Sequence, residues 1–257
     1  MSLFFYFIIF LFGLVVGSFL NCLIYRLETG QSFLRGRSFC PDCKHKLGFW
    51  DLIPVLSFVW LRGRCRYCQK KISLQYPLVE IATGILFVLF VLFFEIRFPI
   101  IDIREIGFLI IIPFLVVIFV YDLKHFIIPD KVIYPAIVIA LIYNLQRCDL
   151  LGRSHLLFSA LGAAAFFGAI VLISRGKWMG IGDIKLAFLM GLVLGFPNIL
   201  AALFLAFFLG AIIGIGLIIF NRKTLKSEVP FGPFLVTGTL AALFWGEAII
   251  NWYLNLI

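Results

Sequence analysis

The chain has 257 residues, of which 63% are hydrophobic and 14% are charged, and its formal net charge is +9. This composition excludes an ordinary soluble domain, in which roughly a quarter of the residues are charged. We therefore expect an all-α polytopic membrane protein with most of its residues in lipid.

Eight apolar segments are candidates for spanning helices, which need roughly 20 apolar residues, and fewer when they are tilted or buried in protein. The third, fourth and sixth segments are short. No basic stretch or small-residue cleavage site accompanies the first, so we expect it to stay as a helix and not to be removed as a signal peptide. The segments are Leu3–Tyr25, Pro77–Phe94, Gly107–Tyr121, Lys131–Leu145, Leu156–Ser174, Ile184–Phe196, Ile199–Phe220 and Gly232–Ile250.

The distribution of Lys and Arg predicts how the chain crosses the membrane, because basic residues near helix ends are retained on the cytoplasmic side. With both termini outside, 18 of the 22 basic residues fall on inner segments. Retention on that side and attraction to anionic lipid account for the positive charge. Membrane lipid is therefore an expected partner, and nucleic acid is not.

One long polar segment interrupts the apolar pattern and divides the chain into three parts. Residues 1–27 are expected to form the first transmembrane helix, residues 28–76 a small cytoplasmic domain, and residues 77–257 a transmembrane bundle. The polar segment is too small to hold a sizeable core by itself. A bound metal ion would therefore contribute directly to its folding.

Two Cys pairs in the polar segment have the spacing of a zinc site. Cys40 and Cys43 form one C-x2-C pair, and Cys65 and Cys68 form the other. A two-residue gap lets both thiolates of a pair reach one tetrahedral ion, and four sulfur ligands leave no open position, so we expect structural zinc. The alternative is a pair of disulfides, which a cytoplasmic location disfavours because thiols there are kept reduced.

Asp122 and Asp183 are the candidate catalytic residues. Asp122 follows the apolar run 108–121, and Asp183 ends the sequence Gly-Ile-Gly-Asp before another apolar run. In the topology above, both lie at cytoplasmic helix ends, where an ionisable group near hydrocarbon is costly and is a functional candidate. Two carboxylates brought together there cannot both ionise easily, so one keeps a proton while the other activates water. That is the chemistry of an aspartyl protease.

Other interpretations of these carboxylates stay open on spacing alone. Each aspartate can end a helix or pair with a base such as Lys124 or Lys185, and Asp183 is well placed as an N-cap. Asp130 is a third acidic candidate, but its position at the start of a helix favours capping. An ion- or proton-coupled transporter would also use buried carboxylates. Its site is expected near the middle of the bilayer between repeats, and no repeat is visible.

Several short motifs occur in order along nearly the whole chain, in addition to the two Cys pairs. They are Gly17–Asn21, Tyr25–Leu27, Asp51–Pro54, Gly63–Arg66, Tyr76–Glu80, Asp122 with Ile128–Asp130, and Gly180–Asp183 with Lys185. In this order they resemble the type IV prepilin leader peptidase / N-methyltransferase family, whose members are GxGD-type membrane aspartyl peptidases.

The resemblance implies an aspartic endopeptidase of the bacterial inner membrane, with Asp122 and Asp183 at the family's catalytic positions. Its substrates would be prepilins or pseudopilins of type IV pili or type II secretion, cut at the cytoplasmic boundary of the membrane.

The resemblance also implies a second activity, N-methylation of the new amino terminus with S-adenosylmethionine as donor. No glycine-rich nucleotide-binding turn is visible in the sequence. Glu80 is the acidic residue that we would test first as part of a donor site, and a pair with Lys70 or Lys71 is its alternative role. A peptidase without methyltransferase activity remains the other interpretation.

Overall fold

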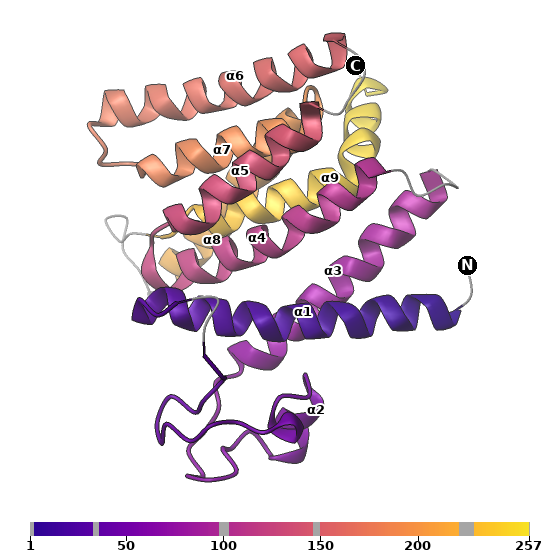
Figure 1. The fold of residues 1–257 in the computed structure, drawn as a ribbon. Coiled ribbons are helices and arrows are strands. Elements are labelled where there is room, and N and C mark those ends of the chain that lie inside the picture. Colours follow the sequence, from indigo (N-terminus) through magenta and orange to yellow (C-terminus); the bar gives the residue numbers. More distant parts are fainter. Residues whose placement is uncertain (1–2, 33–35, 98–102, 146–149, 221–228, 257) are drawn as a thin grey trace. The chain divides into compact units, whose positions relative to one another are not determined.

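The computed structural model describes residues 3–32, 36–97, 103–145, 150–220 and 229–256. These residues are mostly helical, and the strand-like pairings among them are isolated bridges. The helices are α1 (Leu3–Thr29), η1 (Phe49–Asp51), α2 (Leu56–Trp60), α3 (Gln75–Arg97), α4 (Ile103–His125), α5 (Asp130–Leu145), α6 (Leu150–Ser174), α7 (Ile181–Leu194), α8 (Asn198–Ile219) and α9 (Gly232–Leu254) (Figure 1).

Each of the eight predicted apolar segments is a helix, so the all-α membrane fold is confirmed. Within the described ranges, six helices are long and apolar enough to cross a membrane: α1, α3, α4, α6, α8 and α9. Helices α5 and α7, with 16 and 14 residues, are shorter than this measure requires, so six of the eight predicted spans meet it. Helix α7 has 14 residues, because it begins after Gly180 and ends at Gly195, whose φ of 68° does not continue a helix. The chain is a multi-pass membrane protein.

By spatial contact the chain divides into two compact units, Met1–Glu105 (unit 1) and Ile106–Ile257 (unit 2). The three-part division drawn from the sequence, with boundaries after residues 27 and 76, stays a prediction. The four cysteines of the expected metal site lie in unit 1, and the two candidate catalytic aspartates lie in unit 2.

Unit 1 is built on α1 and α3, which cross in close contact (Figure 1). Glycines on α1 allow the approach. A Cβ atom at Gly13 would lie 2.7 Å from the Cα of Gly84, and one at Gly17 would lie 2.7 Å from the Cα of Glu80. Small residues one helical turn apart let two backbones pack without intervening side chains.

We expect Gly17→Ala to lower the stability of unit 1 by about 1–3 kcal/mol, because the new methyl group would need space that the α3 backbone occupies. Thermal unfolding in detergent measures the effect. Gly162→Ala is the matched control, because a Cβ at this α6 glycine meets no atom within 4 Å. An unchanged melting temperature for Gly17→Ala would contradict the close packing of α1 on α3.

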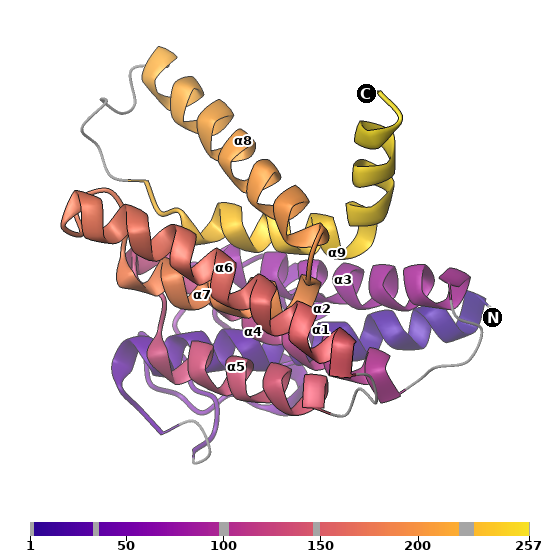
Figure 2. The same ribbon diagram turned by 90° about the horizontal axis from the view of Figure 1, so that it is seen from above.

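Unit 2 is organised around α7, which packs against α5, α6 and α9 (Figure 2). Its side chains at Ala187, Leu189 and Met190 have no exposed surface. Gly191 lies against α6, because a Cβ there would collide with the backbone of Ala160. The later turns of the short helix are thus largely enclosed by protein. In its first turns, Gly182 lies against Ile128, and Lys185 contacts Asp130 of α5.

Candidate active site and metal centre

Asp122 lies in the last turn of α4 and is 4% exposed. Its Oδ2 atom accepts a hydrogen bond of 3.0 Å from the backbone N–H of Gly232, the first residue of α9. The free N–H groups at a helix N-terminus carry a partial positive charge that favours a carboxylate. The start of α9 therefore orients the Asp122 side chain and stabilises its charge.

Gly232 is a site residue that the sequence did not reveal. A Cβ atom at this position would lie 2.5 Å from Oδ2 of Asp122, so a larger residue would displace the carboxylate. The Gly-Pro dipeptide at 232–233 does signal the start of a helix. No sequence pattern, however, indicates that this helix begins against Asp122.

Asp183 is the third residue of α7, whose N-cap is Gly180. The alternative interpretation, in which Asp183 is itself the N-cap residue, is therefore wrong. Its Oδ2 atom instead accepts a 3.2 Å hydrogen bond from the N–H of Gly180, the contact that an acidic residue at the third helical position makes back to the N-cap. There is little free space beside Gly182, because a Cβ atom at this position would lie 3.1 Å from the Cβ atom of Ile128.

Within unit 2, Asp122 and Asp183 are close enough for their charges to interact, and the Asp183 side chain is only partly exposed. Each carboxylate has one oxygen held by a backbone N–H. Lys185 does not neutralise the pair as the alternative interpretation required, because its Nζ atom contacts Oδ1 of Asp130 at 2.6 Å. The structure thus brings together two acidic groups from segments 61 residues apart in sequence.

The cysteine pairs in unit 1 form two turns of the same design. In the first, the N–H of Cys40 bonds to the carbonyl of His45, and Lys44 has a φ of 58°. In the second, the N–H of Cys65 bonds to the carbonyl of Lys70, and Gln69 has a φ of 60°. The residue after the second cysteine of each pair turns the chain back, which points both sulfurs of a pair to one side.

The four sulfur atoms of Cys40, Cys43, Cys65 and Cys68 all lie within 4.8 Å of one another. Cys40 Sγ and Cys68 Sγ are 3.9 Å apart. A tetrahedral zinc ion with bonds of about 2.3 Å separates its sulfurs by roughly 3.8 Å, whereas a disulfide needs about 2.05 Å. The donor set and its spacing therefore fit one metal ion.

Backbone contacts lower the pKa of one of the four thiols, and an ion pair links the two turns. Loss of water raises the pKa of the Cys65 thiol, but the N–H groups of Cys68 and Tyr67 outweigh this effect and lower the pKa to about 7. A hydrogen bond from Lys70 to Asp42, at 2.7 Å, links the second turn to the first and raises the pKa of Lys70.

Glu80 lies in the second turn of α3 and is 7% exposed. Its Oε2 atom accepts a 2.7 Å hydrogen bond from the N–H of Val55, a residue with a φ of 60°. The suggested pair with Lys70 is wrong, because Lys70 contacts Asp42. Glu80 therefore ties the segment between α1 and α3 that carries the four cysteines, the cysteine-rich segment, to α3.

Comparisons with known proteins match both units. A family model described as the bacterial peptidase A24 N-terminal domain matches residues 11–94. A second model, described as the type IV leader peptidase family, matches residues 109–215. No solved structure matches the chain.

Curated relatives cover almost the full length. A prepilin leader peptidase/N-methyltransferase of Aeromonas salmonicida is 33% identical over 97% of this chain and 94% of its own length. A protein of the same name from Legionella pneumophila is 33% identical over 98% of this chain and 95% of its own. A protein of the same name from Bacillus subtilis is 32% identical over 97% of this chain and 98% of its own length.

Proposed function

The chain belongs to the type IV leader peptidase family, and from that membership we propose that it removes the leader peptide from type IV prepilins or pseudopilins. The observation that carries the proposal is that Asp122 and Asp183 lie close enough in unit 2 for their charges to interact. The two carboxylates would act as an aspartic endopeptidase.

The proposed reaction uses one proton shared between the two side chains. The ionised aspartate takes a proton from water, and the hydroxyl attacks the carbonyl carbon of the scissile peptide. The protonated aspartate donates its proton to the carbonyl oxygen. The C–N bond then breaks, the amine leaves with a proton, and the products are the leader carboxylate and a new amino terminus. The N–H groups of Gly232 and Gly180 hold one oxygen of each aspartate during these steps.

The proposed location is the cytoplasmic side of the bacterial inner membrane. The excess of Lys and Arg on the segments that flank both aspartates supports this orientation. The basic residues at 222–226, which contribute to it, lie outside the described residues. A reporter fused after Ile257 should prove extracytoplasmic, and a cytoplasmic reporter would contradict the orientation.

We further propose that the cysteine cluster holds structural zinc and that the chain methylates the new amino terminus with S-adenosylmethionine. The fit of four sulfurs to one tetrahedral ion supports zinc. The full-length similarity to proteins named for both activities supports methylation.

The test is a reaction of the purified chain with a prepilin in detergent micelles, with and without S-adenosylmethionine. Mass spectrometry of the product identifies both the cut and a methyl group on the new terminus. An uncut prepilin would contradict the peptidase, and a cut but unmethylated product would contradict the methylation. Cleavage in micelles also excludes dependence on an ion gradient, which a transporter would require.

Gly232→Ala is expected to lower the cleavage rate by about tenfold or more, because the new methyl group would push the Asp122 carboxylate out of position. Initial rates with a prepilin measure the loss. Gly214→Ala is the control, since a Cβ at this α8 glycine meets no atom within 4 Å. A Gly232→Ala enzyme as fast as the parent would show that the start of α9 does not orient Asp122.

A further inference from the structure

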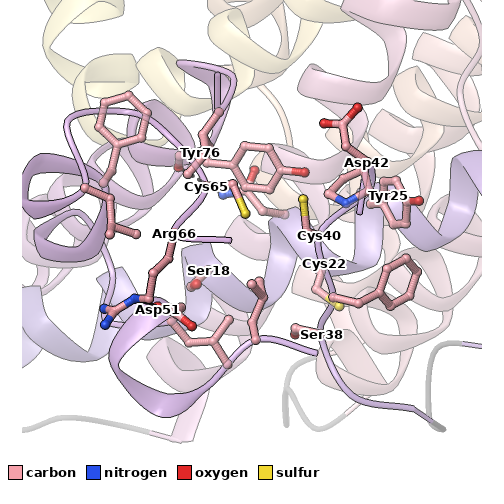
Figure 3. A pocket seen from close by; sticks show the side chains of 18 of the residues that line it. Ser18, Cys22, Tyr25, Ser38, Cys40, Asp42, Asp51, Cys65, Arg66 and Tyr76 are labelled. Atoms are coloured by element: carbon pink, nitrogen blue, oxygen red, sulfur yellow. Dashed lines mark hydrogen bonds and ion pairs between the residues drawn. The ribbon is translucent and has the colours of Figure 1, made fainter. Parts of the chain in front are cut away.

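The stretch of the cysteine-rich segment between its two Cys pairs has an inner and an outer face. The inner face lines a cavity of about 180 Å³ within unit 1 (Figure 3). Each of the five sequence motifs between Gly17 and Glu80 that lie outside the Cys pairs contributes at least one residue to the wall of this cavity. Asp51 is the only charged residue in 49–60, and it belongs to the inner face, because its side chain is 5% exposed and its Oδ1 atom lies 2.7 Å from Nε of Arg66 (Figure 3). Residues 49–60 therefore present no charge to the outside.

The outer face of this stretch is a surface of large apolar side chains, which we call the apolar surface. It consists of five residues that are between 63% and 78% exposed: Phe49 and Trp50 of η1, and Leu56, Val59 and Trp60 of α2. The three residues of α2 are three and four positions apart, so they share one face of the helix, and η1 and α2 contact each other. Exposed apolar surfaces of this kind are uncommon in water and mark interaction sites.

The apolar surface lies level with the first turns of a membrane-spanning helix. The apolar run of α3 begins at Pro77, and Glu80 lies about 4.5 Å further along the helix axis. Gly17 of the spanning helix α1 packs against Glu80 and is at the same level. Because Glu80 accepts the hydrogen bond from Val55, α2 begins at this level and not beyond the end of α3. That is the boundary between headgroups and hydrocarbon, where interfacial helices bury their apolar faces by about 5–10 Å.

The backbone at the start of α2 is suited to an apolar surrounding. A backbone N–H without a partner is costly in lipid, and the first N–H groups of a helix have no partner within it. Here the N–H of Val55 bonds to the carboxylate of Glu80, and the N–H of Ser57 bonds to the carbonyl of Ile53 at 3.0 Å. Pro54 has no N–H. The contact between Glu80 and Val55 therefore removes a cost that lipid would impose on this turn.

The charges around the apolar surface match those of a lipid headgroup layer. Lys46 and Arg62 are exposed and border the surface on either side in the sequence. Residues 36–75 contain eight basic and two acidic residues. Basic residues around an apolar face attract anionic lipid. Tryptophan, present as Trp50 and Trp60, is among the residue types that are enriched where a bilayer meets water.

We propose that η1 and α2 form an interfacial anchor, which inserts the apolar surface into the membrane leaflet at the start of α3 and holds the cysteine-rich segment against the bilayer. In the orientation proposed above, this is the cytoplasmic leaflet. The anchor is independent of the proposed catalytic functions. The level of Val55, the flanking basic residues and the two Trp side chains favour lipid over another protein surface as the occupant.

Photolabelling of the full chain in nanodiscs tests the anchor. The nanodiscs contain phosphatidylethanolamine, phosphatidylglycerol and a phospholipid that carries a diazirine in its acyl chain. Trypsin cuts after Lys46 and Arg62, so it releases the whole apolar surface in one peptide, residues 47–62. We expect lipid adducts on this peptide and far fewer on the peptide 38–44, which contains the first Cys pair. Adducts on the peptide 1–26 of α1 are the internal standard.

Trp60→Glu is expected to lower the adduct yield on peptide 47–62 several-fold relative to peptide 1–26, because a charge on this face opposes insertion. Trp60→Phe is the matched control, since it keeps an apolar ring and should be labelled as the parent is. Trp60 is exposed, so both variants should fold, and equal labelling of peptide 1–26 verifies it.

Two outcomes would overturn the anchor. In the first, peptide 47–62 of the parent chain stays unlabelled while peptide 1–26 is labelled, which would mean that another protein surface covers the apolar surface. In the second, Trp60→Glu is labelled as strongly as the parent. Equal yields in nanodiscs with and without phosphatidylglycerol would overturn the contribution of the basic residues.

Discussion

Asp122→Asn and Asp183→Asn are each expected to lower the rate of prepilin cleavage by about a thousandfold or more, because a positioned acid or base contributes up to about 10⁴-fold. An amide neither takes a proton from water nor donates one to the scissile carbonyl. The double variant is expected to lose little more than either single one, since the two carboxylates act as one unit. Initial rates in detergent micelles measure all three.

The control for these variants is Asp130→Asn. Asp130 is exposed and contacts Lys185, and it lies at the start of α5. Loss of an exposed ion pair is worth at most about 1 kcal/mol, so cleavage by this variant is expected to stay within a few fold of the parent rate. If either Asp122→Asn or Asp183→Asn retained the parent rate, two-aspartate catalysis would be ruled out.

Cys65→Ser is expected to release the metal ion and unfold the cysteine-rich segment. Structural zinc contributes an apparent binding free energy of about 10–16 kcal/mol in small modules, which is comparable to the whole stability of a domain. Metal analysis and limited proteolysis after the substitution measure the two effects. Chelation should reproduce both, and acid should weaken binding because protons compete for the thiolates.

Cys22→Ser is the matched control for the metal site, because this α1 cysteine is outside the four-sulfur cluster. It should keep one zinc ion per chain and resist proteolysis as the parent does. If the parent protein were purified without zinc and with its thiols oxidised in pairs, the four cysteines would form disulfides, and the proposed metal centre would be contradicted.

The positions of the helices could be predicted from sequence because long apolar runs have one stable form in lipid, a helix that satisfies its own backbone hydrogen bonds. The eight segments were therefore found, although their ends shifted. Helix α1 extends beyond Tyr25 to Thr29, and α4 extends beyond Tyr121 to His125, which places Asp122 inside the last turn and not after it. Polar residues can continue a helix where it leaves the apolar run, so composition alone misjudges these ends.

The cysteine cluster was predictable for a different reason. Its spacing is local within each pair, and a tetrahedral ion demands that pairs meet, so the sequence implies the geometry. Glu80 illustrates the opposite case. Its acidic side chain was visible in the sequence, and a pair with a nearby lysine was one of its two interpretations, but the structure gives it the backbone N–H of Val55.

By itself the sequence determined the membrane class and the helices, and it indicated the four cysteines and the two aspartates as candidate site residues, because apolar length, cysteine spacing and isolated charge are local properties of the chain. Only the tertiary structure decided that Gly232, 110 residues from Asp122, holds that carboxylate, and that five separate motifs of unit 1 surround one cavity. Contacts between distant segments depend on how the helices pack. Packing is set by side-chain volume and by the glycines that let backbones approach, and the pattern of residues within one segment does not show which other segment it will contact.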